Sequence, residues 1–271
     1  MEHAPGNVTY YRVPVPKALL MAMPEAERTL FLMLGHLANE LHMLNALQHG
    51  SSGALPDGTS NEGAAEVHKR FQDTQTLLLI RILIGKLNEA WQLLTGNFYG
   101  AKLSKTYVPL LSDHGQQCLD ELKRYFKRKG NVVHTVRNNF GFHYSPESVA
   151  KALPSIPEDE TGWEIIYSQR RVNTLYYASE MGSGYALLAT ICPGGTPQEA
   201  MKMLFSETAD VTHWMTDFVD ECLALFAKTF LYPDRDELEK RWTQVVLKGV
   251  PHENERKISA VAFFGDDAAE I

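Results

Sequence analysis

The chain has 271 residues, of which 44% are hydrophobic and 22% charged, and its formal net charge at neutral pH is -7. This is the composition of an ordinary globular protein with enough apolar side chains for a sizeable core. The negative charge excludes a protein that coats nucleic acid over its whole surface, so any site for a polyanion must be local.

The first third of the chain predicts two long amphipathic helices. After an extended start, Pro24 is placed where a helix can begin, and apolar residues then recur every three or four positions to about residue 49. Residues 51–63 are rich in Gly, Ser, Pro and Asn, which predicts a loop. A second helix is expected over about 62–95.

The middle of the chain predicts three shorter helices. We expect one over 113–129, ended by Gly130, with an apolar face formed by four inward-facing residues, namely Leu119, Leu122, Tyr125 and Phe126. Asn131 is suited to cap the next helix, which must stop before Pro146. Ser145, followed directly by that proline, is suited to cap a third helix.

The last part of the chain mixes a different pattern with further helices. Residues 161–177 carry β-branched and aromatic residues on both sides of a polar centre, which predicts a small β-hairpin. A long helix is expected from Pro197 to about 230, and then a polar helix and a frayed tail. The sequence therefore predicts a mainly α-helical bundle with a small β-hairpin insertion, folded as a single domain over 1–271.

Cysteine usage and hydropathy bear on the compartment. The three cysteines are widely spaced and form no CxxC pair. With no secretory signal peptide ahead of them, we expect neither a disulfide framework nor a zinc knuckle, and we place the protein in a reducing cytoplasm. The most apolar run, residues 77–87, is interrupted by an arginine and a lysine and is shorter than the about 20 residues of a membrane span. No membrane segment is predicted.

The strongest charge asymmetry lies between Leu122 and Pro146, where basic residues occur and acidic residues do not. The basic residues are Lys123, Arg124, Lys127, Arg128, Lys129 and Arg137. One interpretation is a helix end that complements its own dipole, followed by a solvated face. The other is a surface that steers a nucleic-acid backbone.

Arg137 and His143 follow this run and bring together two side chains suited to phosphate chemistry. A six-residue step on a helix rotates the second side chain by about 120° from the first, so the two do not share a face in a regular helix. Gly141 lies between them and loosens the last turn, which can let His143 swing toward Arg137.

The segment 137–143, RNNFGFH, resembles the Rx4-6H motif of the HEPN superfamily, a group of all-helical domains, and in particular its abortive-infection-type branch. The resemblance covers mainly a helical core at about 25–150, with the motif as its specific part and 160–271 as a helical extension. Active relatives are metal-independent ribonucleases whose site forms where two motif copies meet across a homodimer. The resemblance thus implies a bacterial stress or phage-defence endoribonuclease, acting on RNA such as tRNA, without a cofactor.

The resemblance also assigns roles to individual residues. His143 would exchange a proton with the ribose or the leaving oxygen, and Arg137 would stabilise the charge that builds on the phosphate. Asn138 would hold the phosphate or orient the histidine, with Tyr144 as a supporting residue. Because Tyr144 directly follows the histidine, the spacing departs from that of relatives paired with an adenylylating antitoxin. A protein partner or antitoxin is nevertheless among the partners that the family implies.

Three alternatives remain open. The first is a non-catalytic HEPN-like module that dimerises or binds a nucleotide or partner within a defence assembly. The second is a helical protein whose basic run contacts DNA. The third is a metal site on the helix after Pro197, where acidic and histidine side chains share one face: Glu207, Asp210, His213 and Asp217. We interpret this face as the ordinary solvent face, because no second helix offers an obvious matching ligand set, and predict no metal.

Overall fold

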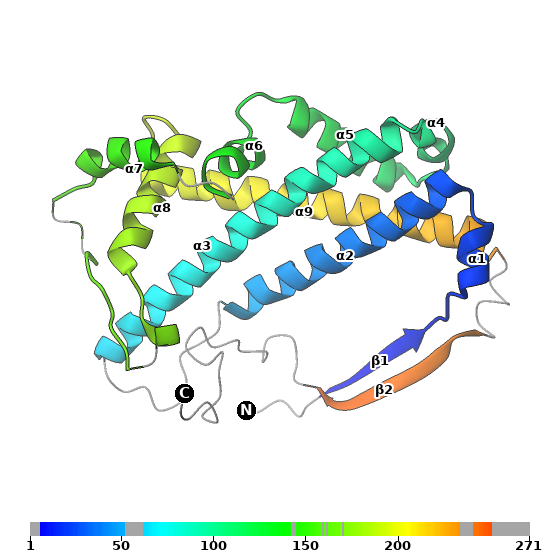
Figure 1. The fold of residues 1–271 in the computed structure, drawn as a ribbon, viewed down its shortest axis with the longest axis horizontal. Helices are drawn as coiled ribbons and strands as arrows, with labels where there is room; N and C mark the ends of the chain where they lie inside the picture. The colour runs from blue at the N-terminus through cyan, green and yellow to red at the C-terminus, as the bar shows by residue number, and fades with distance from the viewer. Residues whose placement is uncertain are drawn as a thin grey trace. The chain divides into compact units, whose positions relative to one another are not determined.

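The structure is a computed structural model that describes residues 6–51, 62–141, 145–158, 160, 162–169, 171–233 and 241–250. These residues form nine α-helices and one sheet of two strands (Figure 1), which confirms the mainly α prediction. The helices are α1 (Lys17–Ala22), α2 (Glu25–Ser51), α3 (Glu62–Leu93), α4 (Leu103–Tyr107), α5 (Asp113–Lys127), α6 (Val132–Val136), α7 (Pro146–Ala152), α8 (Tyr177–Ile191) and α9 (Pro197–Phe226).

Three helices continue into a π-helical turn, in which the backbone hydrogen bonds span one residue more than in an α-helix. These turns are η1 (Leu94–Tyr99), η3 (Arg137–Gly141) and η6 (Ala227–Leu231). Short 3₁₀ turns follow α4 and α7 and precede α8, at η2 (Val108–Leu110), η4 (Leu153–Ser155) and η5 (Arg171–Asn173). The predicted motif segment is thus partly π-helical.

The sheet joins two segments far apart in the sequence. Strand β1 (Gly6–Arg12) pairs antiparallel with β2 (Thr243–Val250), and the two strands lie side by side in Figure 1. Among the described residues of 161–177, the predicted hairpin is represented by one antiparallel bridge, between Ile166 and Leu175, each donating its N–H to the other's carbonyl at 2.8 Å. The sheet itself was not predicted.

The residues group into two compact units. The first unit comprises Met1–His42, Glu89–Lys127 and Thr212–Arg256, and the second comprises Met43–Asn88, Arg128–Val211 and Lys257–Ile271. Helices α2, α3 and α9 each contribute residues to both. The single-domain organisation expected from the sequence stays a prediction.

The core of the first unit is built from leucines and aromatic rings. Leu30, Leu34 and Leu41 on α2 are fully buried, as are Leu119 and Leu122 on α5. These spacings of three, four and seven residues place each set on one face of its helix. The predicted inward face of α5 is therefore confirmed.

Aromatic contacts fix how the elements of the first unit meet. Phe98 of η1 meets Phe218 of α9 edge to face, with ring centroids 5.7 Å apart. Trp91 stacks on Phe126 of α5 at 4.7 Å. Such pairs add about 0.5–1.5 kcal/mol each beyond the burial of their area.

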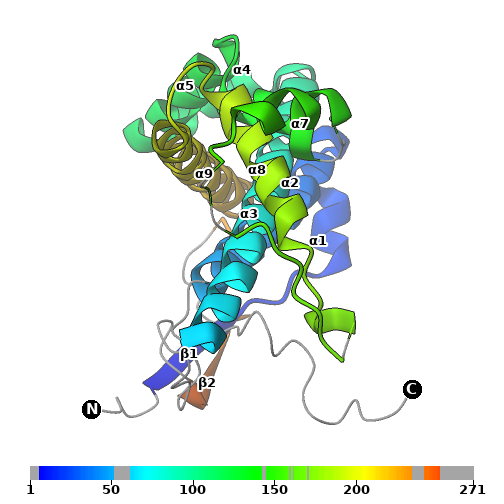
Figure 2. The same cartoon turned by 90° about the vertical axis from the view of Figure 1, so that its left-hand side faces the viewer.

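The second unit packs α6, α7 and α8 with parts of α3 and α9. Helices α7 and α8 lie side by side in both views (Figure 1 and Figure 2). Buried residues from four helices form its core: Ile80, Ile84, Val132, Val133, Val136, Leu187, Ile191, Leu204 and Val211. Two polar contacts tie α8 to the unit, since Arg81 pairs with Glu180 at 3.4 Å and Arg70 lies 4.7 Å from the ring of Tyr177.

The predicted helices mostly match those observed. The helices expected over about 62–95 and 113–129 are α3 and α5, and Asn131 and Ser145 cap α6 and α7 with their side chains as predicted. Most of the predicted loop at 51–63 and the whole frayed tail lie outside the described residues. Among the described helices, none combines the length and the apolar character needed to cross a membrane.

Candidate functional site

The candidate site is built on the short helix α6 and the turn that follows it. Asn131, fully buried, caps α6 by accepting the N–H of His134 at 2.9 Å. Three valines, Val132, Val133 and Val136, anchor the helix in the core. The rigid helix therefore holds the turn η3, which begins at Arg137, at a defined position in the second unit.

His134 lies one helical turn before Arg137, a spacing that puts the two side chains on one face. Its Nδ1 is 3.2 Å from the Asn131 amide nitrogen, so the amide can donate to a neutral ring. Burial, and then the positive charge of Arg137, lower the pKa of His134. The lowered pKa favours the neutral form of an imidazole that lies one helical turn from a guanidinium, a combination the sequence analysis did not single out.

Arg137 and Asn138 are brought together as expected. Arg137 is partly exposed and donates from Nη1 to the Asn138 side-chain oxygen at 3.3 Å, while Asn138 is exposed. Arginine can present paired donors to a phosphate, and an exposed amide beside it can add a further donor. His143 and Tyr144 lie outside the described residues, so their predicted roles stay predictions.

The basic residues of α5 belong to the first unit, and two of them are held in local ion pairs. Lys123 contacts Asp120 at 2.9 Å, and Arg124 contacts Glu121 at 2.7 Å. Lys127 is exposed at the end of the helix. Exposed pairs of this kind contribute about 0–1 kcal/mol, so a polyanion could replace the acidic partner at little cost.

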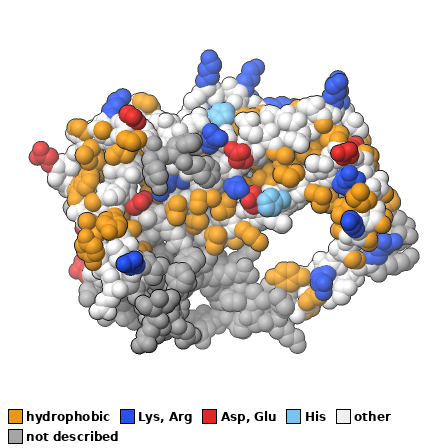
Figure 3. Space-filling model, in the orientation of Figure 1, with side chains coloured by type: hydrophobic (Ala, Val, Ile, Leu, Met, Phe, Trp, Pro, Cys, Tyr) orange, Lys and Arg blue, Asp and Glu red, His pale blue; other side chains and the backbone are white. Residues whose placement is uncertain are grey.

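The last two basic residues belong to the second unit and differ from each other. Arg128 donates to Glu207 at 2.5 Å, and the same carboxylate accepts the N–H of Val132 at 3.2 Å. This contact ties the turn before α6 to α9, which is a structural role. Lys129 is exposed. On the face drawn in Figure 3, Lys and Arg side chains are dispersed and do not form one continuous patch.

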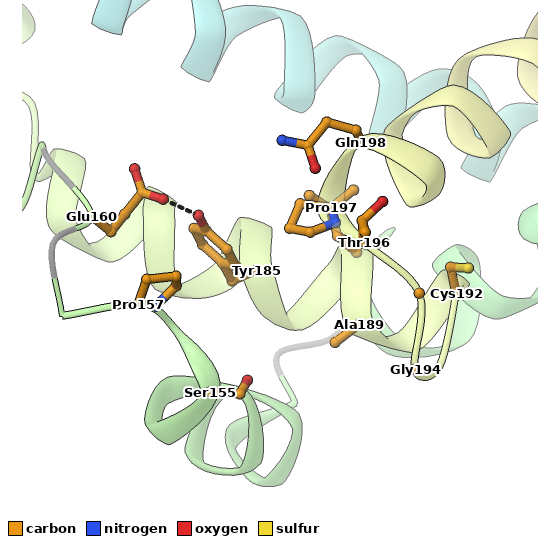
Figure 4. Close-up of a pocket in the computed structure, with 12 residues that line it drawn as sticks. Ser155, Pro157, Glu160, Tyr185, Ala189, Cys192, Gly194, Thr196, Pro197 and Gln198 are labelled. Atoms are coloured by element: carbon orange, nitrogen blue, oxygen red, sulfur yellow. Dashed lines mark hydrogen bonds between the residues drawn. The ribbon is translucent and has the colours of Figure 1, made fainter.

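A pocket of about 560 Å³ lies in the second unit beside α8 (Figure 4). Its polar groups include Tyr185, which donates to the carboxylate of Glu160, and Thr196 at the start of α9. Burial and the Glu160 carboxylate raise the pKa of Tyr185 to about 12, so its hydroxyl stays protonated. The volume falls within the about 300–1,000 Å³ of small-molecule sites.

The first unit holds a group of side chains suited to a metal. One ligand atom each from His114, Cys118 and Asp217 lies within 4.8 Å of the other two. Burial, and then the carboxylate of Asp217, raise the pKa of the Cys118 thiol. His213 approaches Asp217 at 3.5 Å.

Sequence reasoning found only half of this group. It noticed His213 and Asp217 on α9 but not the matching spacing of four residues between His114 and Cys118 on α5. Glu207, grouped with them on the same helix, instead pairs with Arg128. The sequence does contain both pairs of possible metal ligands, each with a spacing of four residues, but on separate helices.

Comparison with known proteins places the chain in no family. The sequence matches no family model and no curated protein, and the structure matches no solved structure.

Proposed function

We propose that the protein is a HEPN-type endoribonuclease of the bacterial cytoplasm that cleaves RNA without a catalytic metal. The observation that carries this proposal is that His134 lies one helical turn before Arg137, the residue at which the RNNFGFH motif and the turn η3 both begin. Burial and Arg137 lower the pKa of this histidine, which favours its neutral form. The π-helical form of this turn is not evidence for the proposed function by itself, because two other helices also end in such a turn. The mainly α fold agrees with the proposal but is shared by many other functions.

The chemistry needs a base, an acid and a group that stabilises the charged phosphate. In this proposal a neutral imidazole takes the proton of the ribose 2′-hydroxyl, whose oxygen then attacks phosphorus. The bond to the 5′-oxygen breaks, and that oxygen takes a proton from a second histidine, which starts as the protonated imidazolium and becomes neutral. Two histidines, His134 and His143, are available for these steps. The products are a 2′,3′-cyclic phosphate and a free 5′-hydroxyl.

Arg137 supplies the third group. Its guanidinium stays charged at any working pH, and its donors suit the extra negative charge on the phosphate oxygens during attack. Asn138 adds a donor and fixes the guanidinium through the 3.3 Å contact. A homodimer that brings two motifs together would double these groups and allow the histidine and arginine to come from different protomers.

The experiment is incubation of the purified protein with total bacterial RNA and with tRNA, with and without EDTA. Wild type should leave 2′,3′-cyclic ends in both conditions, and Arg137→Ala and His143→Ala should abolish cleavage while the dimer persists. Arg171→Ala, which removes an exposed arginine elsewhere in the second unit, is the matched control and should cleave normally. Cleavage that requires an added divalent cation would refute the mechanism.

A second candidate is a non-catalytic binding module for defence, and the pocket beside α8 favours it. Its volume and its Glu160–Tyr185 pair suit a small polar ligand such as a nucleotide base or sugar. If the folded dimer cleaves no RNA, nucleotide binding measured by calorimetry would distinguish this candidate. Loss of binding in Tyr185→Phe, with retention in Arg137→Ala, would place the ligand in the pocket.

A further inference from the structure

Two helices of the first unit present pairs of metal-binding side chains to each other. On α5, His114 and Cys118 are four residues apart, and on α9, His213 and Asp217 are four residues apart. This spacing puts both members of each pair on one face of the helix. The two pairs meet, since His114 Nε2 lies 2.7 Å from Asp217 Oδ2.

We propose that His114, Cys118, His213 and Asp217 form a zinc site that joins α5 to α9. Tetrahedral zinc, with bonds of about 2.0 Å to nitrogen or oxygen and about 2.3 Å to sulfur, separates its ligand atoms by about 3.3–3.5 Å. Cys118 Sγ lies 3.6 Å from His114 Nε2, and His213 Nδ1 lies 3.5 Å from Asp217 Oδ2. The 2.7 Å contact must lengthen by under about 1 Å, and His213, which contacts Asp217 but is not among the three groups that lie within 4.8 Å of one another, must turn toward the other ligands.

The backbone around the site is arranged to allow this approach. A Cβ atom at Gly115 would overlap the Glu221 carboxylate, so the glycine lets this side chain of α9 lie against the first turn of α5. Glu221 in turn accepts hydrogen bonds from the Ser112 backbone N–H at 3.1 Å and from its hydroxyl at 2.5 Å. These contacts fix the first turn of α5, and with it His114 and Cys118, against α9.

A simple ion pair accounts for only part of this arrangement. The contact between His114 and Asp217 would be formed without a metal, as at many surfaces. It does not explain why a thiol that is 2% exposed lies at the base of the same group, or why a second histidine approaches the same carboxylate. Thiolate and imidazole together select zinc over magnesium or calcium, which prefer oxygen ligands.

The exposure of the four groups suggests how the metal enters. The side chains of His114 and His213 are 54% and 64% exposed, while Asp217 is 30% exposed. An ion can therefore reach the imidazoles and the carboxylate from solvent before it displaces the proton of the buried thiol. Binding would then hold α5 and α9 together in the first unit. The site shares no residue with the proposed ribonuclease centre and does not depend on it.

The test uses the full-length protein stripped of metal and titrated with Co²⁺ and then Zn²⁺. Tetrahedral Co²⁺ bound to a thiolate gives visible ligand-field bands and a near-ultraviolet charge-transfer band. We expect one equivalent to bind, zinc to displace it, and the charge-transfer band to vanish in Cys118→Ser. Cys192→Ser, which removes a partly exposed thiol elsewhere, is the matched control and should behave as wild type.

Asp217→Asn provides a second variant in case Cys118→Ser does not fold, because it keeps the side-chain shape at a partly exposed position. Asp217→Asn should weaken zinc binding by at least about 10-fold. The metal-free variant should be about as stable as other variants with a single surface substitution. Zinc should also raise the melting temperature of wild type and not that of Cys118→Ser. No charge-transfer band in wild type, or an identical band in Cys118→Ser, would overturn the proposal.

Discussion

The substitution Gly115→Ala tests how closely α5 and α9 must approach each other. Gly115 is the third residue of α5, is buried, and has the Glu221 carboxylate where a Cβ would be. The added methyl must push this carboxylate away, and with it the two hydrogen bonds from Ser112. The substitution therefore disturbs the contact between α5 and α9 as well as the first turn of α5.

The expected magnitude follows from two opposing terms. Inserting a methyl into a packed contact costs about 1–3 kcal/mol. Alanine in place of glycine favours a helix by up to about 1 kcal/mol, less in the first turn than in the interior. The free energy of unfolding should thus fall by about 1–2 kcal/mol. Urea unfolding followed by circular dichroism measures this change.

Gly182→Ala is the matched control, because it makes the same chemical change on another helix. No atom lies within 4 Å of the position that a Cβ at Gly182 in α8 would take. This substitution should raise the free energy of unfolding by up to about 1 kcal/mol. In a Glu221→Ala background, Gly115→Ala should lose most of its cost, since the overlapping group is gone. Equal stability of Gly115→Ala and wild type would refute the close-approach argument.

Three further substitutions test the second unit. Burial and a neighbouring guanidinium lower the pKa of His134 in the folded protein. The contribution of this histidine to the free energy of folding is therefore complete above its pKa in the unfolded chain, about 6.5, and is lost as the pH falls below that value. His134→Gln should flatten this pH dependence in urea midpoints measured from about pH 7.5 to about pH 5. Glu207→Ala should lower the free energy of unfolding by about 2 kcal/mol, because the carboxylate accepts from Arg128 and from the Val132 N–H, and Glu207→Gln should cost less. Tyr185→Phe should cost about 1 kcal/mol by thermal unfolding, and no loss would contradict its hydrogen bond to the nearby carboxylate.

The elements that could be predicted from the sequence are those fixed by local signals. Asn131 and Ser145 cap helices because their side chains accept the N–H group three residues later, which depends on a few residues only. The inward face of α5 follows from the spacing of its apolar residues. Pro197 begins α9 as expected.

The elements that were missed depend on contacts distant in sequence. Strands β1 and β2 pair across almost the whole chain, and neither segment signals its partner. Helix α8 was not predicted, because Gly182 and Gly184 weaken its helical pattern, and burial of its apolar face compensates for them.

The residues of the candidate sites also differ in whether their signal is local in the sequence or depends on distant contacts. Arg137 and Asn138 could be singled out because they are adjacent in a short motif. The four proposed zinc ligands form two ordinary pairs that become a site only when α5 meets α9. The lowered pKa of His134 likewise depends on its burial, which the sequence does not display.

The pairing of β1 with β2 sets an order on the folding of the chain. The ribosome must release residue 250 before β1, made more than 200 residues earlier, can find its partner. Closing so long a loop costs entropy that only already folded helices between the strands can reduce, by holding the two ends near each other. Until then both edges of β1 are open to pairing with another chain, and β2 covers one of them. Loss of β2 by proteolysis would uncover that edge again.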